Sequence, residues 1–392
     1  MIEGRETIDS GRLLSYGMVG GGPGSFIGGV HRAAIGLEGC AQLVAGCFSR
    51  TEEKNRQTGA QWRLDPSRVY PTFMDMAKEE GRRPDRIDFV TITTPNHTHY
   101  DACKAFLEQG IHVMCEKPLT LTSAQALELR DLARKHDCLF CVAYAYTGHV
   151  MVREARNLIR RGDIGDVIVV MGEYPQDWLI DRLEDSQKQA AWRTDPKQAG
   201  ISNCTGDIGS HIENMVHYMT GLHIQQLCAS LDIIGEGRTL DTNAEMLLRF
   251  DNGARGSYWC SQVAIGNDNA LKVRIFGTKG AIEFEQEKSN DLKVTFKGEP
   301  PRYYTRGAGY LTPEAAAYAR TPTGHPEGYH EAYANLYADF TRAIRQKMAG
   351  EAVDESKVNY PTIDMGISGV RFIESCVESA RRGSVWVQVP ND

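Results

Sequence analysis

The first 150 residues alternate short apolar runs with segments of helical periodicity, and this alternation limits the possible folds most. The apolar runs are typical of buried strands and lie at 14–19, 43–48, 89–93, 111–115 and 139–144. The segments between them, such as 51–60, 100–110 and 122–132, have the spacing of amphipathic helices. Strands that alternate with helices build a parallel sheet through right-handed crossovers. The sequence therefore predicts an α/β domain with a parallel sheet over about 13–146.

A glycine cluster follows the first apolar run and contains Gly20, Gly22 and Gly28. A glycine turn between a strand and a helix can hold a pyrophosphate, because the backbone approaches the phosphates and the helix supplies free N–H groups. Gly20 and Gly22 fit the first two positions of this pattern, whereas Gly28 comes after three additional residues, 23–25. A flexible loop is the alternative for the cluster alone. The strands and helices that follow favour a Rossmann dinucleotide-binding domain.

The end of the second apolar run bears on the choice between NAD and NADP. An acidic residue at this place bonds the ribose hydroxyl of NAD, and an arginine accommodates the 2′-phosphate of NADP. Here Ser49 and Arg50 follow the run, and the first acid is Glu52. The pattern predicts NAD(P) with a preference for NADP. In the alternative, Arg50 points to solvent and NAD binds without a carboxylate.

A charged pair, Glu116 and Lys117, ends the apolar run Ile111–Cys115 and precedes Pro118. The residue before a proline favours an extended backbone, so Lys117 is expected to extend from the strand end. Ligands bind at the carboxyl ends of the strands in open parallel sheets. Lys117 is therefore a candidate for contact with substrate and cofactor, and a solvated lysine at a strand-to-helix turn is the alternative.

The second half of the chain predicts a different domain, over 147–392. Strand-like runs joined by short turns are typical of an antiparallel sheet and lie at 227–234, 244–250, 256–262, 271–276 and 281–285. Helices are expected at 151–161, 327–348 and 363–382. Before the strands comes a long segment, 175–206, in which Trp192 and Arg193 suit a sugar face and its hydroxyls, or else pack in a surface loop.

Asp207 and His211 begin a predicted helix that ends at Gly221. Residues four apart share a helix face, and a neutral imidazole can accept a proton from a hydroxyl near neutral pH. The pair is a candidate general base with an orienting carboxylate, and a capping Asp beside an unrelated surface His is the alternative. No convincing set of metal ligands accompanies the histidines, so no metal site is predicted.

Composition and hydropathy argue against several classes of protein. The net charge of −7 argues against a nucleic-acid partner. No apolar run reaches the ~18 residues of a membrane helix, and residues 1–12 carry no apolar core of a signal peptide. The ten cysteines fall mostly in apolar runs, where they behave as small hydrophobes. Free thiols fit a reducing, cytoplasmic location.

These segments together resemble the Gfo/Idh/MocA oxidoreductases, a family named for glucose–fructose oxidoreductase and inositol dehydrogenase. The resemblance rests on the glycine loop, on Thr94-Pro95-Asn96 with His99, on Cys115-Glu116-Lys117-Pro118, and on Asp207 with His211. It implies a Rossmann domain followed by an α/β domain with a large open, mostly antiparallel sheet. It also implies homodimers or homotetramers formed through that sheet.

The resemblance implies reversible oxidation of one secondary hydroxyl of a sugar, inositol or related polyol. His211 would be the general base, and Asp207 and Lys117 would assist proton transfer. The predicted cofactor-binding residues are Gly20, Gly22, Ser25, Phe26, Ile27, Ser49, Arg50, Thr94, Pro95, Asn96, His99, Glu116 and Lys117. The predicted substrate-binding residues are Lys117, Tyr146, His149, Trp192, Arg193, Asp207, His211 and His325.

Three other functions remain open at this point, of which the first, a nucleic-acid binder, is disfavoured by the net charge. An enzyme of the same fold can retain its nicotinamide and recycle it, in aldose–ketose exchange or glycoside cleavage. A non-catalytic nucleotide sensor is the last alternative, although the presence of Lys117, Asp207 and His211 argues against it.

Overall fold

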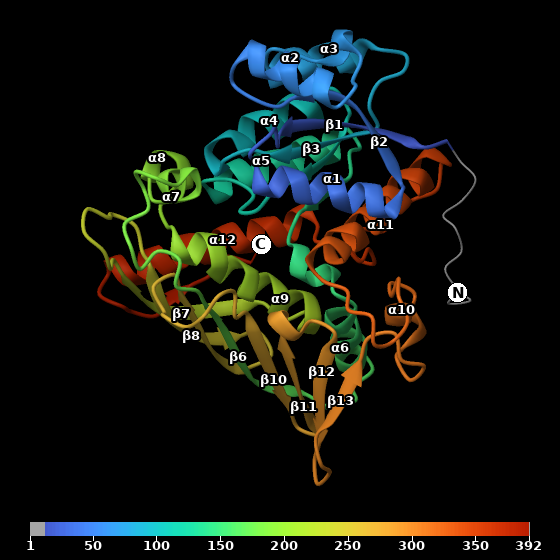
Figure 1. The fold of residues 1–392 in the computed structure, drawn as a ribbon. Coiled ribbons are helices and arrows are strands. Elements are labelled where there is room, and N and C mark those ends of the chain that lie inside the picture. The colour runs from blue at the N-terminus through green and yellow to red at the C-terminus, as the bar shows by residue number, and fades with distance from the viewer. Residues whose placement is uncertain (1–11, 392) are drawn as a thin grey trace. The chain divides into compact units, whose positions relative to one another are not determined.

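The computed structural model describes residues 12–391, which form two compact units (Figure 1). The Rossmann unit contains 12–148 and 329–367, and the sheet unit contains 149–328 and 368–391. The sequence analysis placed a single boundary at 146/147, but the segment Tyr329–Ile367 groups with the first unit. Residues 1–11, which carry most of the predicted polar N-terminus, lie outside the described residues.

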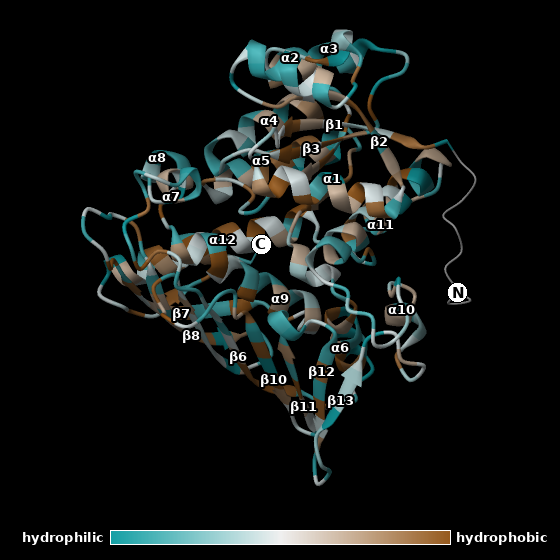
Figure 2. Cartoon of the chain, viewed as in Figure 1, coloured by the Kyte–Doolittle hydropathy of each residue, from teal (hydrophilic) through white to brown (hydrophobic). Residues whose placement is uncertain are grey.

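The Rossmann unit is built on a five-stranded parallel sheet with the strand order β2-β1-β3-β4-β5. The strands are β1 (Leu14–Gly20), β2 (Ala41–Cys47), β3 (Phe89–Thr93), β4 (His112–Cys115) and β5 (Phe140–Val142). The helices between them are α1 (Phe26–Glu38), α2 (Glu52–Gln61), α3 (Phe73–Arg82), α4 (His99–Leu107) and α5 (Ser123–Lys135). Strands β1 and β3 are mainly apolar (Figure 2), as expected for a parallel sheet covered on both faces.

Helix α11 (Tyr329–Met348) explains why a late segment joins the first unit. Its residues Tyr333, Tyr337, Phe340 and Ile344 are spaced like one face of a helix and are buried in a core that also contains Phe89. The sequence predicted this helix from 327, and it begins two residues later. The sequence predicted that this segment is a helix, but it did not predict the surface against which the helix packs.

The carboxyl ends of β1, β3 and β4 meet at one edge of the parallel sheet. Gly20 pairs with Thr93, and Ile92 pairs with Cys115. Strand β2 lies on one side of β1, and β3 lies on the other side. The direction in which strands are added thus reverses between β1 and β3, and open α/β sheets bind ligands at such a point. The glycine loop, the segment after β3 and the Glu116-Lys117 pair therefore share this edge, as the sequence predicted.

The sheet unit contains nine strands in the order β13-β12-β11-β10-β6-β9-β8-β7-β14. All neighbours are antiparallel except β6 and β9, which are parallel. The strands are β6 (Val167–Pro175), β7 (Ile224–Asp232), β8 (Asn243–Phe250), β9 (Arg255–Ser261), β10 (Lys272–Gly277), β11 (Gly280–Glu285), β12 (Asp291–Phe296), β13 (Arg302–Thr305) and β14 (Val387–Gln388). This confirms the predicted fold class, an α/β chain with a parallel and a mostly antiparallel sheet.

Helices cover one face of the large sheet. They include α6 (Val150–Arg160), α9 (Ser210–Thr220) and the part of α12 (Ile363–Arg381) that belongs to this unit (Figure 1). Shorter helices lie in the connections: α7 (Lys188–Arg193), α8 (Pro196–Ala199) and α10 (Pro313–Ala316). Buried and exposed residues alternate along β8, and Figure 2 shows the corresponding alternation of hydropathy along the strands.

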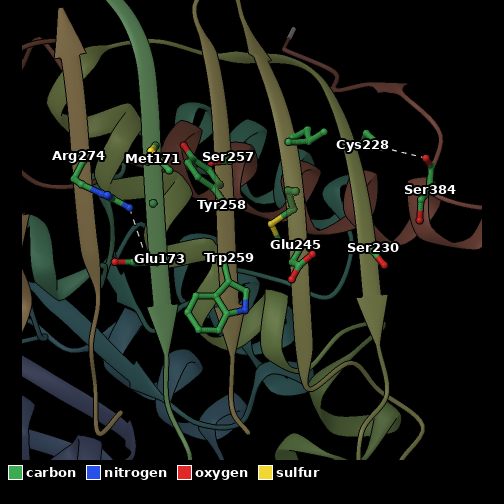
Figure 3. A pocket seen from close by; sticks show the side chains of 13 residues that line it. Met171, Glu173, Cys228, Ser230, Glu245, Ser257, Tyr258, Trp259, Arg274 and Ser384 are labelled. Atoms are coloured by element: carbon green, nitrogen blue, oxygen red, sulfur yellow. Dashed lines mark hydrogen bonds and ion pairs between the residues drawn. The ribbon is translucent and has the colours of Figure 1, made fainter. Parts of the chain in front are cut away.

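None of the residues 12–391 covers the other face of the sheet, which carries a pocket (Figure 3). Its lining includes Glu173, Arg274 and Trp259, and an ion pair joins Arg274 to Glu173 at 3.8 Å. Leu247 is 55% exposed on the same face. The pocket lining includes neither Asp207 nor His211. These two residues belong to the helical segment 205–220, on the face of the sheet that helices cover. We call this uncovered surface the open sheet face.

Two predictions from composition can be compared with the structure. All ten cysteines are free thiols, and nine of them are buried. Within residues 12–391 no helix is long and apolar enough to cross a membrane.

Candidate active site

The turn between β1 and α1 has the geometry of a phosphate loop. Gly20 and Gly21 have φ angles of 79° and 70°, a region in which a side chain is strained. The backbones of Gly21 and Gly28 lie so close that a Cβ on Gly28 would be 2.2 Å from the Gly21 Cα, so no larger residue fits there. The loop therefore fits a pyrophosphate, although its third glycine is displaced by an insertion.

The first residues of α1 confirm that this loop leads directly into a helix N-terminus. Ser25 is the N-cap, and its hydroxyl accepts a hydrogen bond from the Gly28 N–H at 3.2 Å. Phe26 and Ile27 are the first two helical residues, where N–H groups are available to an anion. The Phe26 ring is 68% exposed and stacks on Tyr329 with ring centroids 6.3 Å apart.

The end of β2 is fixed by a buried amide. Asn55 Oδ1 accepts hydrogen bonds from the backbone N–H groups of Phe48 and Ser49 at 2.8 and 2.7 Å. Arg50 follows and is exposed. The backbone at the end of β2 is thus held in place immediately before Arg50.

The segment after β3 is held in place by a buried histidine. His99 is fully buried, and its two ring nitrogens lie 2.9 Å from the Pro118 carbonyl and 2.8 Å from the Thr94 carbonyl. Burial lowers the pKa of this imidazole. The ring therefore ties the end of β3 to the turn after β4. Contact of His99 with the cofactor stays a prediction. Thr94, Pro95 and Asn96 remain at the sheet edge.

Glu116 lies in a buried polar network next to Lys117. Its Oε1 is 2.8 Å from His31 Nε2 and accepts a hydrogen bond of 2.8 Å from the Tyr333 hydroxyl. Its Oε2 accepts a hydrogen bond from the Lys117 backbone N–H at 3.2 Å. Burial opposes ionisation of Glu116, but His31, Lys117 and Tyr333 outweigh it and hold the pKa below its ordinary value.

This network fixes the backbone from which the Lys117 side chain extends. His31 Nδ1 is in turn 2.6 Å from the Tyr337 hydroxyl, so α1 and α11 both hold the strand end. Lys117 itself is partly buried, and the Lys117–Pro118 peptide bond is cis. The sequence identified Glu116 and Lys117 but gave no indication of His31 and Tyr333, which are distant in sequence.

In the sheet unit, Asp207 lies in a π-helical turn, Thr205–Gly209, that leads into α9. Such turns occur often at functional sites because they displace one residue from the regular helix. The sequence predicted a continuous helix here. His211 is the second residue of α9, is mostly buried, and lies 6.1 Å from the Tyr174 ring.

Two donors hold one oxygen of the Asp207 carboxylate. Arg193 Nε donates to Oδ2 at 3.1 Å, and Gln262 Nε2 donates to the same atom at 3.0 Å. The Arg193 guanidinium also stacks over Trp192 at 4.4 Å. The structure therefore brings Trp192, Arg193 and Asp207 together as the sequence analysis proposed, whereas Gln262 was not predicted.

The other predicted substrate residues are placed as follows. Tyr146 is buried in the Rossmann unit, with its ring 5.9 Å from that of Tyr329. His149 is the N-cap of α6 and lies 5.9 Å from the Phe284 ring. His325 is exposed in the connection between α10 and α11, and a buried ion pair of 3.0 Å between Arg306 and Glu327 holds this connection.

Comparison with known proteins identifies the family. Residues 14–144 match the model of an oxidoreductase family with an NAD-binding Rossmann fold, and residues 152–283 match the GFO/IDH/MocA C-terminal domain. An uncharacterized oxidoreductase, YfiI of Bacillus subtilis, is 38% identical over 99% of both chains. This chain belongs to the Gfo/Idh/MocA oxidoreductase family.

Two further members of the family are similar and have more informative names. The crystal structure of an inositol dehydrogenase homolog from Azotobacter vinelandii, complexed with NAD⁺, has a TM-score of 0.93 at 36% identity and covers 96% of this chain and 97% of its own. A levoglucosan dehydrogenase of Pseudarthrobacter phenanthrenivorans is 30% identical over 78% of this chain and 81% of its own. The chain is thus an oxidoreductase with an NAD-binding Rossmann fold. Membership of the family does not identify its substrate.

No group of three or more His, Cys, Asp or Glu residues in the part of the chain that the structure describes is arranged to hold a metal ion.

Proposed function

We propose that this protein is an NAD(P)-dependent dehydrogenase that reversibly oxidises a secondary hydroxyl of a sugar, glycoside, inositol or related polyol. The observation that carries the proposal is the arrangement in the sheet unit, where Asp207 is held by Arg193 and Gln262 at the start of the helix that carries His211. The names of similar proteins support a cyclic polyol or sugar. One is a levoglucosan dehydrogenase, and one was crystallised with NADH and myo-inositol.

Each residue has a definite role in this proposal. The glycine loop would hold a nicotinamide dinucleotide, which would supply the acceptor for the hydride of the carbinol carbon. His211 removes the hydroxyl proton, because a neutral imidazole is a suitable base near neutral pH. Asp207 orients that imidazole and stabilises its charged form. The Lys117 ammonium stabilises negative charge on the oxygen as it becomes a carbonyl.

The finer assignments follow the same proposal. Trp192, Arg193, Tyr146, His149 and His325 would contact the substrate. Arg50 would favour NADP, because it is exposed beside the ordered end of β2. The remaining cofactor contacts would be those of the glycine loop and of the segment after β3.

Assembly and location are also part of the proposal. The open sheet face exposes large apolar side chains such as Leu247 and would join copies of the chain into a homodimer or homotetramer. The free, mostly buried thiols are consistent with the cytoplasm.

The test is a substrate panel measured by the absorbance of reduced nicotinamide. The purified protein is assayed with NAD⁺ and NADP⁺ against myo-inositol, levoglucosan and common sugars. The same panel is repeated with His211→Ala, and with His136→Ala at the end of α5 as a matched control. We expect at least one neutral polyol to be oxidised, with turnover lowered about 10² to 10⁴-fold by His211→Ala only. A His211→Ala enzyme as active as the control would exclude His211 as the base.

A further inference from the structure

We propose that Gln262 is a positioning residue that holds the Asp207 carboxylate in its productive orientation, and that Asn203 and Asp241 fix the direction of the Gln262 amide. This inference rests on the proposed function, because it concerns the same site. It adds three residues that none of the sequence motifs contains. They lie at three separate places in the chain and meet through buried hydrogen bonds.

The Asp241 backbone carbonyl determines the polarity of the whole chain of hydrogen bonds. A carbonyl can only accept, so the Asn203 atom that lies 3.2 Å from it must be the donor Nδ2. The same Nδ2 lies 2.7 Å from Gln262, so the Gln262 atom that faces it must be the acceptor Oε1. The Gln262 Nε2 then necessarily faces Asp207 Oδ2, at 3.0 Å.

Burial makes this arrangement rigid. Gln262 is 0%, Asn203 2% and Asp241 4% exposed. The Gln262 backbone is held on both sides, since its N–H donates to the Thr242 carbonyl and its carbonyl accepts from the Leu179 N–H. A buried amide that turned around would lose two hydrogen bonds at once and place its oxygen against a carboxylate, which is strongly unfavourable.

The Asp241 side chain also holds the backbone that leads to Asp207. Its carboxylate accepts hydrogen bonds from the N–H groups of Asn203 and Thr205 at 2.8 and 2.7 Å, and from the Thr205 hydroxyl at 2.8 Å. Thr205 is the first residue of the π-helical turn that contains Asp207. One residue thus anchors both the backbone that carries Asp207 and the amide that orients its side chain.

The consequence concerns proton transfer. Donation from Gln262 and Arg193 keeps Oδ2 of Asp207 an acceptor and stabilises the ionised carboxylate. Other charged or titratable groups near this carboxylate are His211 on α9, the Asp241 carboxylate and the buried Cys204 thiol, whose pKa burial raises well above its ordinary value. Loss of the Gln262 donor should therefore change the acid limb of the pH profile and not merely the amount of folded enzyme.

The experiment compares Gln262→Met, which keeps the shape and removes the donor, with Gln262→Glu, which keeps the shape and adds a second carboxylate. Gln226→Met on β7 is the matched control, because Gln226 accepts a hydrogen bond from Arg249 in the same unit but outside this network. Turnover is measured against pH with the substrate found in the panel, and nicotinamide affinity is measured by fluorescence. Crystal structures of the variants show the Asp207 carboxylate directly.

We expect Gln262→Met to lower kcat at least about tenfold, which corresponds to about 1.4 kcal/mol. The substrate KM and the affinity for the nicotinamide should change little, and the acid limb should move to higher pH. Gln262→Glu should approach the wild type at low pH, where the two carboxyls share a proton, and lose activity as pH rises. The Asp207 carboxylate should leave Arg193 in the Gln262→Met crystal structure, and in the Gln262→Glu structure obtained at high pH.

Several results would overturn this inference. They are an unmoved Asp207 carboxylate in the variants, an unchanged kcat, or a uniform loss at every pH that Gln226→Met reproduces. If the wild-type protein oxidises no polyol, the proposed function fails, and the position of the Asp207 carboxylate in the variant structures still decides the role of Gln262.

Discussion

Glu213 on α9 should make the protein less stable as pH rises. Its carboxyl is buried, and burial raises its pKa from the ordinary value of 4.5 to about 7, although the Ser368 hydroxyl donates to Oε1 at 2.6 Å. The folded protein therefore binds a proton at Glu213 that the unfolded chain has already released between pH 4.5 and about 7. Stability is full below pH 4.5, falls across this interval, and stays at the lower value above it.

The size of the effect follows from the interval. At about 1.36 kcal/mol per pH unit, the range from 4.5 to about 7 corresponds to roughly 3 kcal/mol. Glu213→Gln keeps the shape and the hydrogen bond from Ser368 but cannot ionise. The variant should thus be more stable than the wild type by about that amount at pH 8, and similar to it at pH 4.5.

Denaturant unfolding at a series of pH values provides the assay. The difference between wild type and Glu213→Gln isolates this carboxyl, because buried histidines such as His217, whose pKa burial lowers to about 4, titrate alike in both proteins. Glu245→Gln, on the open sheet face, is the matched control. A difference that does not grow between pH 4.5 and 8, or that Glu245→Gln shows equally, would refute the reasoning.

Three further predictions concern the cofactor, the lysine and assembly. Lys117→Met should lower turnover at least about 100-fold, equivalent to about 2.7 kcal/mol, with little change in Tm; retained turnover would make Lys117 structural. Arg50→Ala should weaken NADP much more than NAD in fluorescence titrations, and equal losses would show that Arg50 does not bind the 2′-phosphate. Leu247→Lys should reduce the molar mass measured by light scattering, because it places a charge on the open sheet face; a wild-type monomer would contradict the proposed oligomer.

The sequence was sufficient for the parts of the fold that repeat a local pattern. The five parallel strands, the glycine turn after β1 and the antiparallel strands β7 to β11 follow from periodicity and turn residues, and the structure has them. The strands β12, β13 and β14 were not predicted. The grouping of α11 with the Rossmann unit could not be predicted, because Tyr333 and Tyr337 pack on residues some 300 positions earlier in the chain, such as His31. An apolar helix face does not identify its partner.

The candidate site divides in the same way. Lys117, Asp207 and His211 stand in local patterns with recognisable spacing. The residues that hold them in place are distant in sequence. His31 bonds to Glu116, beside Lys117, from 85 positions away, and Gln262 bonds to Asp207 from 55 positions away. The one local clue to Gln262 was a polar residue at the end of an apolar strand, which is too common to single out. The place of His99 in a motif likewise did not show that its ring contacts the carbonyls of Thr94 and Pro118.

The central claim is that the enzyme removes hydride from a secondary carbinol carbon. The most direct measurement uses the panel substrate labelled with deuterium at that carbon, and follows the label by mass spectrometry of the nicotinamide while kcat/KM is compared with the unlabelled substrate. The account predicts one deuterium in the reduced nicotinamide and a slower reaction of the labelled substrate. Turnover that leaves the nicotinamide unlabelled would contradict it.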